Sequence, residues 1–260
     1  TSSCHKNRRK GGWKGICNMG VQMKILIIGS APDSIRARHW NMDLFDRVIV
    51  INNAWKVTTK WDELIFPHDF PEENEPTILL NHQKTVTEEQ FVPAQNLFGG
   101  FVYAGATMAF TAGYWALAHH KPSTICFLGC NMHYSQNEPT HFYGQGQPDP
   151  MRNDISLTSL QACSHRMLIL AKNQGCDMVS LSPGEFNLHV PQISPDDVAR
   201  YQSSFLISEP KVEEALSLEK QLNYYVEDGR YWTKAHLFSH SELVKLDQIW
   251  IDAVSSNAPN

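Results

Sequence analysis

Hydroxyl and amide side chains follow the apolar runs of this chain, at positions where strands are expected to end. Ligands of an open parallel sheet bind beyond the carboxyl ends of its strands, where such side chains can hydrogen-bond to a base, a ribose or a sugar. Each of these residues alone is more commonly a cap or turn residue. Together they predict a ligand crevice lined by Ser30, Asn52, Asn53, Asn131 and Ser182.

The first of these strand ends is the most informative, because an apolar run at 24–28 breaks into the loop Gly29-Ser-Ala-Pro-Asp-Ser34. Gly29 lets the backbone approach a ligand, Ser30 and Ser34 offer hydroxyls, and Asp33 or Ser34 can cap the next helix. Such a loop commonly holds the phosphate or ribose of a nucleotide. The loop has only one of the three glycines of the dinucleotide-binding fingerprint GxGxxG. Any α/β fold also needs a turn at this point, so the loop by itself does not identify a nucleotide site.

A long polar and aromatic segment, 130–153, contains His141 between aromatic neighbours. A loop of this length in a compact domain is more often functional than not. His133 and His141, joined by Asp149 or Asp154, would be an alternative metal site, but their spacing matches no recognised signature. The chain has no DxD sequence and no GxSxG sequence. We therefore expect neither a bound metal nor a serine nucleophile, and we expect the thiols of Cys126 and Cys130, in or at the end of an apolar strand, to be inert.

Strand and helix patterns alternate along the chain, which predicts an α/β fold. We expect a Rossmann-like parallel sheet with helices on both faces and a C-terminal helical extension. The expected strands are 24–28, 46–51, 62–66, 77–80, 124–128 and 177–181. The expected helices are 35–42, 105–120, 156–172, 211–227 and 239–253, with a further helix start at 194–197.

The composition is that of a protein with one substantial core. The 260 residues are 42% hydrophobic, with a net charge of −5 that argues against a general nucleic-acid binder. The six cysteines show no framework spacing, and no apolar run is long enough for a membrane span. We expect a cytoplasmic protein with reduced thiols. Peripheral contact with a membrane and assembly into a homo-oligomer both stay open. The expected division is a basic disordered leader at 1–22, a ligand-binding α/β domain at 23–187 and a helical extension or lid at 188–260.

A series of short motifs resembles the bacterial sialyltransferases of glycosyltransferase family 42. The motifs are GSAPDS, VIVINN, YAGATMAF, TICFLGCNMHY, THFYG and MVSLSPGEFN, and they occur in the family's order over 23–187, about two-thirds of the chain. The resemblance implies a single GT-A-like nucleotide-binding domain with a lid. It also implies transfer of a sugar from a CMP-activated donor to a surface glycan such as lipopolysaccharide, with inversion and without a metal or other cofactor.

The resemblance also implies roles for particular residues. His141 corresponds to the family's general base, since an imidazole can take the proton of the acceptor hydroxyl. Tyr134 lies near the position of a tyrosine that stabilises the departing phosphate, a task that Tyr143 can share. The resemblance matches Gly29, Ser30, Ser34 and Asn52 to nucleotide-contacting positions of the family. We expect Asn53, Gly105, Asn131 and Ser182 to complete the nucleotide-binding set.

The chain departs from the family pattern at three places. Ser30 replaces the loop asparagine, and Asn131 stands where the family has an aspartate. The arginine expected just before the apolar helix has no counterpart, because the neighbouring residues are Phe101, Val102 and Tyr103. The donor is therefore either sialic acid or a related sugar.

Two other functions remain open. One is that of the DUF115-type proteins, which resemble Mg²⁺-dependent pterin diphosphokinases and would need a carboxylate pair in the crevice. The other is a non-catalytic nucleotide-binding module.

Beyond residue 187, the aromatic residues Tyr224, Tyr225, Tyr231 and Trp232 can stack on a sugar or pack in a core.

Overall fold

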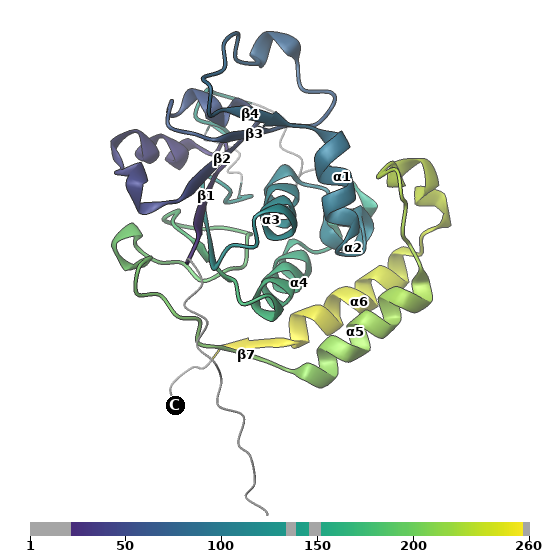
Figure 1. Ribbon diagram of the computed structural model, residues 1–260. Helices are drawn as coiled ribbons and strands as arrows, with labels where there is room; N and C mark the ends of the chain where they lie inside the picture. Colours follow the sequence, from purple (N-terminus) through teal and green to yellow (C-terminus); the bar gives the residue numbers. More distant parts are fainter. Residues whose placement is uncertain (1–21, 134–138, 146–151, 257–260) are drawn as a thin grey trace, which may run out of the picture.

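A six-stranded parallel sheet forms the centre of the molecule (Figure 1). The structure, a computed structural model, describes residues 22–133, 139–145 and 152–256. Its strands are β1 (Lys24–Ile28), β2 (Arg47–Ile51), β3 (Glu63–Ile65), β4 (Lys84–Val86), β5 (Thr124–Leu128) and β6 (Asp177–Ser180), in the order β4-β3-β2-β1-β5-β6. The predicted Rossmann-like α/β sheet is therefore confirmed.

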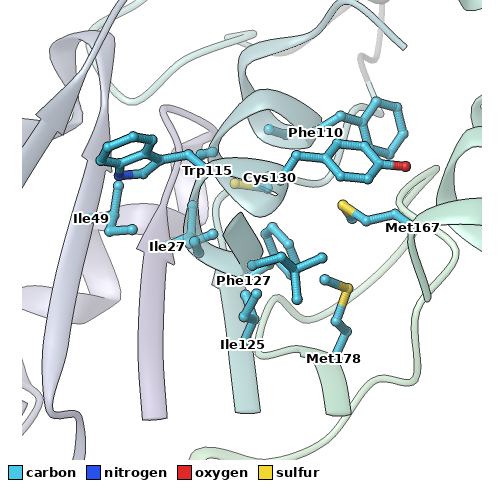
Figure 2. Close-up of a cluster of buried hydrophobic side chains, with 14 of the residues drawn as sticks. Ile27, Ile49, Phe110, Trp115, Ile125, Phe127, Cys130, Met167 and Met178 are labelled. Carbon is cyan, nitrogen blue, oxygen red and sulfur yellow. The ribbon is translucent and has the colours of Figure 1, made fainter. Parts of the chain in front are cut away.

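Different kinds of helix cover the two faces of the sheet. One face packs against α1 (Glu88–Asn96), α3 (Met108–His119) and α4 (Leu160–Asn173). Figure 2 shows this core, in which side chains of strands β1, β2, β5 and β6 meet Phe110 and Trp115 of α3 and Met167 of α4. The other face packs against three short 3-10 helices, Pro32–His39, Met42–Leu44 and Asn52–Lys56. Both faces are apolar because parallel strands are buried on both sides.

The fourth strand differs from the sequence prediction. The apolar run at 77–80 is a loop whose Ile78 is 79% exposed, and the strand that pairs with β3 is Lys84–Val86. Helix α1 follows directly and begins with a capping box of Thr87 and Gln90. Neither α1 nor the short helix α2 (Phe101–Ala104) was expected from the sequence. The expected helix start at 194–197 is a single 3-10 turn, Pro195–Asp197.

The amino edge of the sheet contains a fully buried carboxylate, Glu63, whose charge is compensated by its neighbours. Trp115 Nε1 donates to it at 2.6 Å, and His120 Nε2 and Lys84 Nζ lie 2.9 and 3.3 Å from its Oε1. Burial by itself raises the pKa of Glu63, but the contacts with His120 and Trp115 lower it to about 2. At this edge, then, the fold supplies partners for a charge that it buries.

The C-terminal extension consists of the helices α5 (Glu209–Leu222) and α6 (His240–Asp252) and the antiparallel strands β7 (Phe205–Ile207) and β8 (Val254–Ser256). Figure 1 shows both helices beside α4, with the segment that joins them reaching toward α1 and α2. The predicted boundary at 187/188 stays a prediction, although Leu188 and Val190 pack in the core of the sheet. No described helix is both long and apolar enough to span a bilayer.

A buried ion pair connects the extension to the sheet domain. Arg166 of α4 makes a two-pronged contact with Glu219 of α5, at 2.7 Å from Nε and 2.9 Å from Nη2. Arg166 also donates to Tyr114 Oη and to the Phe98 carbonyl, and Trp250 Nε1 of α6 donates to Glu219. Burial by itself lowers the pKa of Arg166, but the carboxylate of Glu219 raises it above its usual value.

Removing one partner of this pair should be far more destabilising than removing both. Glu219→Gln leaves a buried guanidinium without its counter-charge, so we expect a loss of about 3–5 kcal/mol in urea unfolding. The double variant Arg166→Met/Glu219→Leu should recover most of that loss. The matched control is Arg200→Met, which breaks an ion pair with side chains 78% and 55% exposed and should cost less than about 1 kcal/mol. Equal losses for Glu219→Gln and Arg200→Met would contradict this account.

Candidate functional site

The carboxyl edge of the sheet has a topological switch point between β1 and β5. From β1 the chain continues through β2, β3 and β4 toward one side, whereas β5 and β6 lie on the other side. The loops that follow β1 and β5 therefore leave in opposite directions, and ligands of open α/β sheets bind in the crevice between such loops.

The two loops touch through Gly29 and Gly129. Gly29 N donates to Leu128 O at 2.8 Å, and Ala31 N donates to Gly129 O at 3.0 Å. A Cβ on Gly29 would lie only 2.3 Å from Gly129 O, so no side chain fits there. The close backbone approach that we expected at Gly29 is thus made to the neighbouring loop, and a ligand contact of Gly29 stays a prediction.

Buried polar atoms without hydrogen-bond partners gather at this edge. They are Asp33 Oδ1, Asp33 Oδ2, Ser34 Oγ, Asn52 Oδ1 and Asn131 Oδ1, which make up five of the ten such atoms in the described part of the chain. A buried polar group without a partner costs about 1–3 kcal/mol. Asn52 also has a left-handed backbone with φ of 50°, a strained conformation of the kind found at functional sites. The predicted residues Ser34, Asn52 and Asn131 therefore each have a buried polar atom that no described residue satisfies.

The segment that carries His141 lies against the first loop. Phe142 N donates to Ser30 O at 3.0 Å, and His141 and Gly144 form a pair of backbone hydrogen bonds. Thr140 Oγ1 lies 2.8 Å from His141 Nδ1, and the imidazole stacks on Tyr143 with 4.9 Å between ring centres. Partial burial lowers the pKa of His141. The structure thus brings His141 and Tyr143 to the loop after β1.

The other predicted site residues have different surroundings. Ser182 Oγ accepts a hydrogen bond from Gly129 N and so supports the second loop. Asn53 Oδ1 accepts from Lys56 Nζ on the surface. Gly105 packs against Phe110 and Cys163, where an added Cβ would come within 2.8 and 3.0 Å. Tyr134 lies outside the described residues, so its predicted role stays a prediction.

A cleft of about 710 Å³ opens at the same edge, between the sheet domain and the extension. Its walls come from the loop after β3, from α1, from the start of α3 and from residues 228–233. Arg152, Arg230, Tyr231 and Trp232 line it together with Thr107, the N-cap of α3. Thr107 Oγ1 also lies 3.7 Å from Met132 Sδ, so the cleft adjoins the loop after β5.

Sequence reasoning missed Arg152, which lies at the start of α3. Its Nη2 donates to the carbonyl of Ala106 at 3.3 Å and is 3.2 Å from Asp154 Oδ2. Asp154 also accepts from Tyr231 Oη at 2.6 Å. Arg152 thus brings a guanidinium to the residue directly before Thr107, the N-cap of α3, from a position 46 residues away in the sequence. Nothing in the local sequence signals this contact, because it depends on the tertiary fold.

Among the described residues, no group of three or more histidine, cysteine, aspartate or glutamate side chains could hold a metal ion. Asp149 of the alternative metal site lies outside the described residues, so the expected absence of a metal stays a prediction. His133 Nε2 lies 3.4 Å from Glu185 Oε2.

Comparisons with models of protein families, with curated proteins and with solved structures found no match. The resemblance to the sialyltransferases therefore stays a prediction from motifs.

The bond between Tyr231 and Asp154 should hold the wall of the cleft in place. Burial, together with this bond, raises the pKa of Tyr231, so its hydroxyl stays a donor at neutral pH. Tyr231→Phe should cost about 1.5–3 kcal/mol in urea unfolding, the value of a hydrogen bond to a charged group. It should also speed amide exchange at 228–233. Tyr225→Phe, at a position 44% exposed, is the matched control and should cost less than about 0.5 kcal/mol. Equal behaviour of the two variants would show that the bond does not stabilise the wall.

Proposed function

We propose that this protein is an inverting, metal-independent glycosyltransferase that uses a CMP-activated sugar, sialic acid or a relative, to modify a surface glycan. The observation that carries the proposal is the group of buried polar atoms at the switch point, beside the segment of His141, that no described residue satisfies. Such atoms favour a ligand rich in hydrogen-bonding groups, as a nucleotide is. The motif order of the sialyltransferases supplies the choice of CMP.

His141 is the general base of the proposed reaction. Because its pKa is lowered by burial, the imidazole is neutral at pH 7 and able to accept a proton. It takes the proton of the acceptor hydroxyl while that oxygen attacks the anomeric carbon, and the nucleotide phosphate leaves from the opposite face of the sugar. Thr140, close to Nδ1, orients the ring.

The cleft beside the switch point would hold the sugars. Arg152 offers a cation for the carboxylate of a sialic acid donor, and it lies at the positive end of α3. Trp232, 55% exposed at the cleft, offers a ring face on which a sugar can stack. This lining supports the proposal of an acidic sugar as donor.

A thermal-shift panel of CMP, CDP, UMP, UDP, GDP and ATP, each with and without Mg²⁺, tests the nucleotide. A bound ligand raises the melting temperature by mass action, and we expect selective stabilisation by CMP or CDP that does not require Mg²⁺. Preference for ATP with Mg²⁺ would favour the diphosphokinase function instead. No response to any nucleotide would contradict the proposal.

His141→Ala tests the catalytic role. We expect kcat with CMP-sialic acid and a glycan acceptor to fall about 10²–10⁴-fold, while the melting shift with CMP is retained. In the wild type, kcat/KM should fall on acidification only below pH 6.5, because protonation of His141 removes the base and its pKa is lowered from 6.5. The control is His82→Ala in an exposed loop, which should keep full activity. A fully active His141→Ala enzyme would exclude His141 as the base.

A further inference from the structure

We propose that Asp33 binds the vicinal hydroxyls of a ribose, so that the loop after β1 holds the nucleoside part of the ligand rather than its phosphate. The inference rests on the proposed function, because it takes the crevice to be a nucleotide site. It adds a specificity-determining residue that sequence analysis considered only as a helix cap.

Asp33 does not act as a cap in the structure. The 3-10 helix Pro32–His39 begins after Ala31, and no side chain makes a capping hydrogen bond there. Both carboxylate oxygens of Asp33 are buried without a partner in the described part of the chain. Arg36, the nearest cation in sequence, donates instead to Leu181 O. Asp33 is therefore a buried acceptor whose partner must come from elsewhere.

The loop that carries Asp33 packs against the loop after β5. Ala31 N donates to Gly129 O at 3.0 Å, and a Cβ on Gly129 would lie 2.7 Å from Cβ of Ser34, the residue after Asp33. Burial raises the pKa of the Cys130 thiol in the loop after β5, and the charge of Asp33 raises it further. Cys130 precedes Asn131, whose side-chain oxygen is also unpartnered. Ser30 is on the same loop as Asp33, and its Oγ lies 3.5 Å from Ile51 O at the end of β2. The next residue, Asn52, has a buried side-chain oxygen that no described residue satisfies. Asp33 thus belongs to a loop that contacts both the loop after β5 and the end of β2.

The chemistry of these atoms selects against a phosphate. A carboxylate and amide oxygens accept hydrogen bonds, whereas a phosphate needs donors and would be repelled by the carboxylate. Two adjacent hydroxyls match the two oxygens of Asp33, and a carboxylate at this edge of α/β folds commonly binds a ribose hydroxyl. Glu63 at the opposite edge shows that this fold supplies partners for a carboxylate that it buries. Because no described residue is such a partner for Asp33, its buried carboxylate points to a ligand.

Calorimetric titration of the full chain with ribonucleotides and their 2′-deoxy counterparts tests the inference. The probes are CMP, UMP, AMP and GMP and the matching deoxynucleotides. The wild type should bind CMP at least about tenfold more tightly than 2′-deoxy-CMP, since a lost hydrogen bond to a charged group has that effect. Asp33→Asn should weaken CMP binding by a similar factor and abolish the discrimination. Asp43→Asn, at an exposed position of a neighbouring 3-10 helix, should bind like the wild type.

Each other outcome overturns a distinct claim. Equal binding of CMP and 2′-deoxy-CMP by the wild type, or unchanged discrimination in Asp33→Asn, would refute the ribose contact and leave the proposed transferase standing. Asp33-dependent ribose preference for AMP rather than CMP would uphold the contact and overturn the CMP donor. Stabilisation of the wild type but not of Asp33→Asn by Mg²⁺ alone would assign the carboxylate to a cation, and binding of no nucleotide would overturn both proposals. The wild-type comparison needs no variant, so it decides even if Asp33→Asn fails to fold.

Discussion

The buried pair of Arg166 and Glu219 connects the C-terminal helices to the sheet domain, within an apolar cluster that α2, α4, α5 and α6 share. Glu219 also accepts from Trp250, so the pair joins α4, α5 and α6 at one point, while Arg166 reaches Tyr114 and the end of α1. A buried ion pair of this kind is costly to break from one side. The position of residues 228–233, and with it the wall of the cleft, therefore depends on this contact.

The sheet imposes the second constraint. Its strand order places Gly29 and Gly129 side by side, and their loops are so close that a side chain at either glycine would collide with the other loop. The loops leave Asp33, Asn52 and Asn131 with buried oxygens that no described residue satisfies. Such groups reduce stability, and under the proposed function their use in binding a nucleotide accounts for their presence. On that proposal the strand order determines where the site lies, and the buried oxygens without a described partner determine its chemistry.

The sequence was informative where structure is local and uninformative where it depends on distant contacts. Five of the six sheet strands follow from short apolar runs, whereas β4 is a short edge strand that begins with a lysine and is defined by its pairing with β3. The strand ends indicated Asn52 and Asn131 because periodic patterns fix where strands stop. Asp33 looked like a cap because capping is the commonest use of its position. Arg152 was missed because its contact with Ala106 spans 46 residues.

Hydrogen exchange of the full chain with and without CMP tests the central claim that a nucleotide binds at the switch point. The account predicts slower amide exchange in the described segments that form it, at 29–34, 51–53, 129–132 and 140–144. Exchange at the amino edge, around Glu63 and His120, should not change, because those groups already have partners. Protection confined to the amino edge, or the absence of protection in all four segments at saturating CMP, would contradict the account.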